Sequence, residues 1–168
     1  MTSLPTLDQL LAIEPTLERT VPPDFIDLNG HMNIGRYLEI GSTGIWRLAQ
    51  TRLGMTDDYI PARGMSTFTV EQHLTYLSEL REGELVSVHP RLLDAGDKAL
   101  HLVALIVDRT HGRLACVLES SLVHVDMATR RATPFPPDVA ALVATEVAAD
   151  RELGWDPPLS GTMGVRRG

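Results

Sequence analysis

Apolar residues repeat with two different periods in this chain, and the change falls near residue 64. From Ile34 to Leu53 they recur every three or four residues, which predicts one amphipathic helix. Over residues 65–77 they alternate with polar residues, which predicts a strand with one buried face that carries Phe68, Val70, Leu74 and Tyr76. Turn-forming residues separate three further expected strands, at 85–93, 99–109 and 114–126. One long helix followed by antiparallel strands indicates an α+β fold and excludes alternating βαβ units.

The expected helix contains two glycines, Gly41 and Gly44. Each lowers helix propensity by about 1 kcal/mol relative to alanine, so we interpret them as a face pressed closely against other backbone. Asn33 is expected to cap the helix and Gly54 to end it. The strands at 99–109 and 114–126 are apolar on both faces, which predicts a sheet covered on both sides. Such a sheet buries the helix most easily by curling around it.

The length of 168 residues indicates one domain, with its core at about 17–145. Residues 1–13 are expected to form a short N-terminal helix or an arm. A Pro-rich corner at 128–137 precedes a second helix, capped by Asp138, and a tail, which together occupy 138–168. The lone Cys116 cannot form an internal disulfide, so an oxidised secreted scaffold is excluded.

Charge and hydropathy exclude several classes of partner. The formal net charge of −7 argues against a protein that binds nucleic acid through a general phosphate footprint. No apolar run approaches the roughly 20 residues of a membrane span, and the first residues lack a signal layout, so we expect no membrane partner and a cytoplasmic location. The six histidines are scattered, mostly within expected strands, and with a single cysteine they predict no metal site.

Chemistry is concentrated in the segment from Asp27 to Asn33, which joins a glycine turn to the start of the long helix. The first turn of a helix has unpaired amide donors and a partial positive charge, and it can hold an oxyanion. A carboxylate just upstream is then positioned to attack a carbonyl or to activate water. The alternative is that Asp27 and Asn33 are ordinary turn and cap residues.

The same segment resembles the signature of a known enzyme family. It reads Asp27-x-x-Gly30-His31-Met32-Asn33-x-x-x-Tyr37-Leu38-Glu39. It is similar to the N-terminal signature of hotdog-fold acyl-CoA thioesterases of the 4-hydroxybenzoyl-CoA thioesterase type. The resemblance extends over residues 17–145 and favours the thioesterases of carnitine and betaine catabolism. It implies a long central helix wrapped by an antiparallel sheet, as the periodicity also indicates.

The resemblance assigns roles by position. Asp27 matches the catalytic carboxylate, as nucleophile or general base. Ile34 matches the residue whose backbone amide polarises the thioester carbonyl. Gly30, His31 and Asn33 shape the loop, and His31 is also a candidate to bind substrate or the attacking water. The family needs no metal or organic cofactor, since coenzyme A belongs to the substrate. Its acyl pocket lies between subunits, which implies a homodimer or a dimer of dimers, a homotetramer.

A wider set of residues is expected to face the acyl-CoA substrate. These are Glu39, Ser42, Thr43 and Trp46 on the helix and Thr67, Thr69, Glu71 and His73 on the following strand. Their polarity favours a small or polar acyl group. Glu39 or Glu71 is a candidate partner for a trimethylammonium group, with Trp46 as a cation–π face. Glu71 also competes with Asp27 for the role of catalytic carboxylate.

Coenzyme A carries phosphates, so a local basic site is expected within the acidic chain. The candidates are Arg63, Arg91, Arg130, Arg131, Arg166 and Arg167. Two other functions remain open. One is a non-catalytic acyl-CoA-binding module. The other is an acyl-thioester dehydratase of the same fold, although the His and Asp motif typical of that class is not found here.

Overall fold

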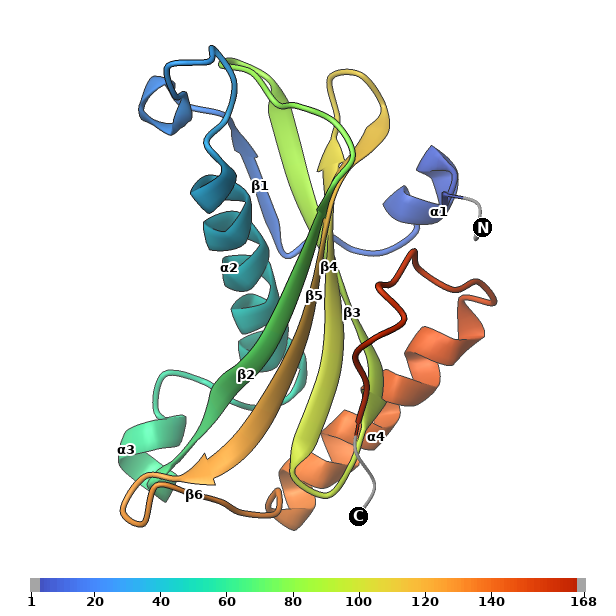
Figure 1. Cartoon of the computed structure of the whole chain (residues 1–168). Coiled ribbons are helices and arrows are strands. Elements are labelled where there is room, and N and C mark those ends of the chain that lie inside the picture. Colours follow the sequence, from blue (N-terminus) through green and yellow to red (C-terminus); the bar gives the residue numbers. More distant parts are fainter. Residues whose placement is uncertain (1–3, 166–168) are drawn as a thin grey trace.

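The long helix α2 (Ile34–Arg52) lies across one face of an antiparallel sheet in the computed structural model, which describes residues 4–165 (Figure 1). The strands are β1 (Leu17–Thr20), β2 (Met65–Tyr76), β3 (Leu85–Ala95), β4 (Ala99–Asp108), β5 (Arg113–Asp126) and β6 (Arg131–Ala132). They are arranged in the order β1-β3-β4-β5-β2, and β6 pairs with β5. The predicted α+β class is confirmed.

Helix α2 begins and ends where the sequence indicates. The Asn33 side chain accepts a hydrogen bond from the Gly35 amide, and Gly54 follows the helix with a φ of 71°. The two internal glycines do lie on the buried face. A Cβ atom added to Gly44 would be 2.4 Å from Val88 Cγ1, and one added to Gly41 would be 2.8 Å from Leu118 Cδ2. The atoms that approach so closely belong to side chains of the sheet, not to backbone as expected.

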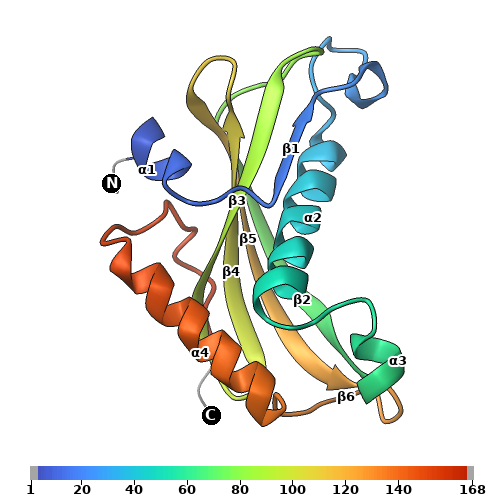
Figure 2. The same cartoon turned by 180° about the vertical axis from the view of Figure 1, so that it is seen from behind.

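A second layer covers the opposite face of the sheet (Figure 2). It consists of α1 (Leu7–Leu11), α4 (Pro137–Glu152) and the segment that follows α4. Leu10 and Ile13 pack there against Val103, Leu105 and Val107 of β4. The prediction that the central strands are covered on both faces is therefore confirmed. None of the helices among residues 4–165 has the length and apolar character needed to cross a membrane.

Helix α4 packs against β3 beyond the point where β1 ends. Strand β1 pairs only with the first part of β3, up to Val88, and α4 packs against β3. A buried ion pair joins them, with Arg91 Nε 2.6 Å from Asp150 Oδ1 and side chains 3% and 9% exposed. The Arg91 guanidinium also lies 4.3 Å from the ring centroid of Trp155. Burial of both charges makes this contact a strong constraint on the position of α4.

Three details differ from the sequence-based expectations. A short helix, α3 (Tyr59–Arg63), which the pattern did not predict, lies between α2 and β2. Helix α4 has Pro136 at its N-cap position, and the Asp138 carboxylate instead binds Arg63. The corner before α4 contains the short strand β6. Short elements of this kind are fixed by contacts distant in sequence, which local patterns do not report.

Strand β2 differs most from expectation, because its apolar side chains are not buried within one chain. Phe68 is 64% exposed, Val70 54% and Tyr76 46%. The pairing with β5 also shifts register between Thr69 and Glu71, so a β-bulge interrupts the alternation. Because one extra residue inverts the faces, the expected single face is divided between both sides of the sheet. β2 is also an edge strand, since β5 is its only neighbour in the strand order.

Buried histidines have structural partners in the fold. His89 lies with Nδ1 2.6 Å from the Ile13 carbonyl oxygen and Nε2 2.7 Å from Ser87 Oγ. His101 contacts Glu119 at 2.8 Å. Burial lowers the pKa of His89, and the hydrogen bond to the Ile13 carbonyl opposes this effect. These contacts account for the imidazoles of His89 and His101 without a ligand.

Candidate active site

The turn before α2 fixes the position of Asp27. Its amide donates to the His31 carbonyl at 3.1 Å, and its carbonyl accepts from the Gly30 amide at 3.0 Å. Gly30 has a φ of 79°, a conformation that favours glycine. The Asp27 Oδ1 atom accepts a hydrogen bond from the Asn29 amide at 2.8 Å, which forms an Asx turn. This leaves the second carboxylate oxygen with no protein partner among residues 4–165.

Two backbone hydrogen bonds anchor this turn to the core. The Met32 amide donates to the Leu80 carbonyl at 2.7 Å, and the Asn33 amide donates to the Phe25 carbonyl at 2.8 Å. Met32 and Phe25 are themselves buried. The segment after β2 is tied to the same place, because Tyr37 Oη accepts from the Leu80 amide at 2.9 Å. Burial raises the pKa of Tyr37 to about 12, so its hydroxyl stays protonated within the core.

The start of α2 keeps one backbone donor available. Asn33 Oδ1 is 2.9 Å from the Gly35 nitrogen, and the Asn33 carbonyl oxygen is 2.9 Å from the Arg36 nitrogen. No acceptor in the described chain takes the Ile34 amide, which is the first of the unpaired donors at a helix N-terminus. The helix dipole adds a partial positive charge there. The carboxylate of Asp27 and a free helix-end amide therefore belong to the same short segment.

A cavity of about 460 Å³ opens beside this turn. Its lining consists of Asp24, Phe25, Ile26, Asp27, Asn33, Gly35, Arg36 and Glu39. We call it the Asp27 cavity. Arg36 pairs with Glu39 at 2.5 Å, and its guanidinium also lies 4.6 Å from the centroid of the Phe25 ring. The Arg19 guanidinium lies 4.4 Å from the same centroid.

The structure gathers part of the predicted site around this cavity. Asp27, Asn33 and Glu39 line it, and Gly30 and His31 belong to the adjoining turn. Ile34 lies between two lining residues without lining the cavity itself. His31 is close enough to Glu79 to contribute, after Arg81, to the lowered pKa of that carboxyl.

Other predicted residues lie elsewhere within one chain. Thr43 and Trp46 are nine and twelve residues beyond Ile34, which corresponds to about 14 and 18 Å along the helix axis. The Thr43 hydroxyl donates to the Glu39 carbonyl within the helix.

The strand residues are separated by the bulge in β2. Gln72 reaches Ser42 of α2, so its neighbours Glu71 and His73 point to the opposite face of the sheet. Thr67 and Thr69, on the other side of the bulge, pair with His124 and Leu122. The roles of all these residues stay predictions.

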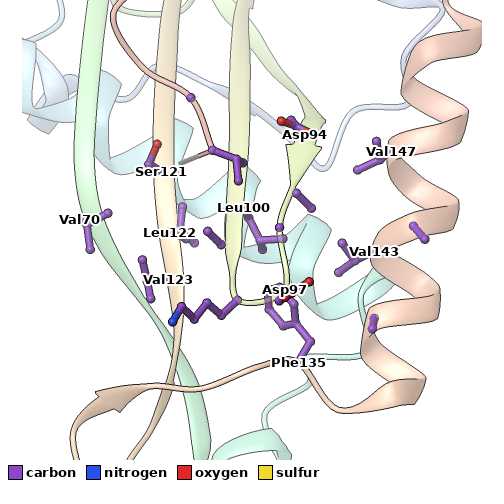
Figure 3. A pocket seen from close by; sticks show the side chains of 18 of the residues that line it. Val70, Asp94, Asp97, Leu100, Ser121, Leu122, Val123, Phe135, Val143 and Val147 are labelled. Carbon is purple, nitrogen blue, oxygen red and sulfur yellow. The ribbon is translucent and has the colours of Figure 1, made fainter. Parts of the chain in front are cut away.

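Glu71 lines a different and larger cavity of about 1170 Å³ (Figure 3). It lies between the lower part of the sheet, helix α4 and the end of the described chain, with Val70, Val123, Val143 and Val147 among its lining residues. Asp27 is absent from that lining. Within one chain, the two candidate catalytic carboxylates therefore do not share a pocket.

Asp24 and Arg36 are the charged residues of the Asp27 cavity that sequence reasoning missed. Their positions, three residues before Asp27 and three after Asn33, were the sequence signal that could have identified them. The short 3-10 helix η1 (Pro23–Phe25), which carries Asp24, is not visible in the hydrophobic pattern. The cation–ring contacts at Phe25 come from Arg19 of β1 and Arg36 of α2, and the hydrophobic pattern does not report them either.

The predicted arginine set is dispersed. Arg91 is buried against Asp150, so its guanidinium is not available to a phosphate group. Arg63 pairs with Asp138, and Arg130 lies with Arg131 at the turn that leads into β6. Arg166 and Arg167 lie outside the described residues.

Within residues 4–165, one group of three potential metal ligands is found, at Glu84, Asp108 and His111. The Asp108 carboxylate already accepts hydrogen bonds from the His111 ring at 2.8 Å and from Arg113 at 3.1 Å. Burial raises the pKa of Asp108, but these hydrogen bonds outweigh it, and the pKa is lowered. The group forms an ion-pair network around one buried carboxylate.

An antiparallel sheet curled around one long helix, with a carboxylate-bearing turn at the helix N-terminus, defines the hotdog class of thioester enzymes. A model of the thioesterase-like superfamily matches residues 21–143, and the chain belongs to that superfamily. This confirms the predicted family, and with it the predicted enzyme class of thioester hydrolases.

Two curated relatives are similar over most of this chain. One is the betainyl-CoA thioesterase of Pseudomonas aeruginosa, 33% identical over 82% of this chain and 86% of the relative. The other is the L-carnitine dehydrogenase/betainyl-CoA thioesterase of Ruegeria pomeroyi, 33% identical over 98% of this chain. The chain spans only about a third of the length of the latter protein.

A solved structure from Staphylococcus aureus, in complex with CoA, has the same fold. Its TM-score is 0.81 at 27% identity, and the match covers 92% of this chain and 97% of that one. A second, described as a putative thioesterase from Pseudomonas putida, has a TM-score of 0.76 at 28% identity over 93% and 98% of the two chains.

Proposed function

We propose that this chain hydrolyses an acyl-CoA thioester to a free acid and CoA, with Asp27 as the catalytic carboxylate. The observation that carries the proposal is the turn itself. It holds one Asp27 oxygen on the Asn29 amide and leaves the other free beside a cavity. The Ile34 amide, which has no acceptor in the described chain, is the proposed donor to the thioester oxygen as negative charge develops there.

Two routes use the same residues. As a general base, Asp27 takes a proton from water, the water oxygen bonds to the carbonyl carbon, and the carbon–sulfur bond breaks to release the CoA thiolate. As a nucleophile, Asp27 bonds to the carbonyl carbon and expels the thiolate, and water then cleaves the anhydride. A single turnover in H₂¹⁸O tests for the anhydride, because the general-base route places the heavy oxygen only in the product acid, whereas heavy oxygen in Asp27 identifies the nucleophilic route.

The proposed substrate is a short acyl group that carries a trimethylammonium, as in betainyl-CoA. Two observations support this class. The relatives that match most of this chain are named for betainyl-CoA, and the cavity beside Asp27 is small and lined with carboxylates.

The test is release of free thiol from a panel of betainyl, short-chain, aromatic and long-chain acyl-CoA thioesters. Asp27→Asn should lower turnover by about 10²-fold or more, within the range for loss of a general base. Asn29→Ala is the matched control for the turn, since its side chain has no described partner. No wild-type activity on any thioester would favour a binding module. Normal activity of Asp27→Asn would move the catalytic role to Glu71.

We also propose that the functional unit is a homodimer joined along β2. The twelve-residue edge strand exposes Phe68, Val70 and Tyr76, and the adjacent face of α2 exposes Ile34 and Trp46. Exposed apolar edges of this length are sites of strand pairing.

The substitution Phe68→Lys should therefore yield monomers in light scattering after size-exclusion chromatography. A lysine at Leu142, an exposed leucine of α4, should leave the mass at two chains. A monomeric wild-type protein would refute this assembly.

A further inference from the structure

The Asp27 cavity has an unbalanced charge. Its lining holds three carboxylates, from Asp24, Asp27 and Glu39, against the one guanidinium of Arg36, a formal charge of −2. A negative cavity attracts a cationic acyl group, repels an anionic one, and has no net charge–charge interaction with a neutral one. The charge of the lining therefore bears on which acyl groups enter.

The three carboxylates are not equally available. Arg36 holds Glu39 at 2.5 Å, and the Asn29 amide holds one oxygen of Asp27. Asp24 is exposed, and its carboxylate has no hydrogen-bond or ion-pair partner among residues 4–165. It is nevertheless held in place, because the 3-10 helix η1 follows Pro22 and the Phe25 amide donates to the Pro22 carbonyl at 3.1 Å.

The ring of Phe25, the aromatic residue of the cavity, already contacts two arginines. The guanidinium carbons of Arg19 and Arg36 lie 4.4 and 4.6 Å from the Phe25 centroid. Phe25 is also buried, so its ring is not available as a cation–π partner for a substrate. A cationic group in this cavity must therefore be balanced by a carboxylate.

We propose that Asp24 is the specificity-determining residue that pairs with a positively charged acyl group. This rests on the proposed function. In a betainyl thioester a single methylene separates the quaternary nitrogen from the carbonyl carbon, so the cation lies in the Asp27 cavity whenever Asp27 reaches the carbonyl. Asp27 acts on every acyl group and Glu39 is paired, which leaves Asp24 to distinguish a charged group from a neutral one.

The test compares betainyl-CoA with 3,3-dimethylbutyryl-CoA, a neutral isostere in which carbon replaces the quaternary nitrogen. The measured quantity is the ratio of kcat/KM for the two substrates. Differences in intrinsic reactivity and in binding of the CoA moiety cancel when this ratio is compared between wild type and variant. Asp24→Asn should lower the ratio about tenfold. Tenfold is about 1.4 kcal/mol, the attraction of unit charges about 6 Å apart at an effective dielectric constant of about 40.

Two further variants isolate the charge of Asp24. Asp24→Glu should keep most of the preference for the cation. Asp156→Asn, which removes an equal charge from an exposed residue after α4, should leave the ratio at its wild-type value. The preference should also weaken with added salt in wild type and much less in Asp24→Asn, because screening acts on exposed charges.

Several outcomes would overturn the assignment. If Asp24→Asn lowered activity on both thioesters by the same factor, Asp24 would have a structural role, while the proposed function would stand. A ratio that stayed unchanged because neither activity fell would also exclude Asp24 as the determinant. A wild-type enzyme that hydrolysed neither thioester but cleaved others would overturn the cationic substrate class. Absence of activity on all thioesters would contradict the proposed function itself.

Discussion

Replacing Gly44 by alanine tests how closely α2 approaches the sheet. The new Cβ would lie 2.4 Å from Val88 Cγ1 and 3.1 Å from Val88 Cβ, closer than real Cβ contacts. Val88 is fully buried on β3, and a β-branched side chain has little freedom at χ1. The helix cannot simply move away either, because Thr16 Oγ1 donates to the Gly44 carbonyl at 2.9 Å.

Two opposing effects decide the sign of the change. Alanine improves helix propensity by about 1 kcal/mol, whereas overpacking a core costs about 1–3 kcal/mol. A contact this short belongs at the upper end of that range, so the free energy of unfolding should fall by about 1–2 kcal/mol. For a domain of this size that lowers Tm by about 2–8 °C.

Urea unfolding at a fixed protein concentration measures the effect, with Gly41→Ala as the matched control. Gly41 meets the terminal Cδ2 of Leu118 at 2.8 Å, a flexible group that can move, so its loss of stability should be smaller. Combining Gly44→Ala with Val88→Ala should give a double variant about 1–2 kcal/mol more stable than the sum of the two changes. A stabilised Gly44→Ala protein would refute the argument that packing, not propensity, selects glycine here.

Three further predictions concern buried charge, pH and the thiol. Asp150→Asn leaves the buried Arg91 guanidinium without its counter-charge and should lower the free energy of unfolding by about 3–5 kcal/mol in urea, whereas a loss below 1 kcal/mol would show that the pair is solvated. Because burial lowers the pKa of His89, the unfolded chain binds more protons than the folded one below about pH 6.5, so stability should fall from pH 7 to pH 5, and His89→Gln should flatten that slope; equal slopes would contradict this. Burial raises the pKa of Cys116 to about 12, so a disulfide reagent at pH 8 should find no thiol in the folded protein and one per chain after denaturation, and rapid labelling of the folded chain would disprove its burial.

The sequence was a sufficient guide where local chemistry determines structure. Asn33 caps α2 because its side chain reaches an amide two residues away, and Gly54 ends the helix through its own backbone conformation. The burial of β4 on both faces follows directly from its continuous apolar run. The turn at Asp27 could also be predicted, since the hydrogen bonds of Asp27 itself reach only Asn29, Gly30 and His31.

Features that depend on partners distant in sequence could not be predicted in this way. The bulge between Thr69 and Glu71 contains no glycine that would mark it, yet it decides which side chains of β2 face α2. The apolar alternation correctly predicted that β2 is a strand, but most of its apolar side chains lie on a surface that a single chain leaves exposed. The charge of the Asp27 cavity comes in part from Asp24 and Arg36, which lie near the motif in sequence but which no periodicity assigns to the cavity.

The two ends of the sheet have opposite consequences for growth of an assembly. At one end β1 is only four residues long and carries Glu18 and Arg19, and α4 packs against β3 beyond it. Short, charged or covered edges do not template another strand, so among the strands of residues 4–165 β2 alone offers a long edge for pairing. A chain with a single long edge strand can pair with only one other chain through it. In the proposed homodimer the two β2 edges pair with each other, so no long edge remains there to template a fibre.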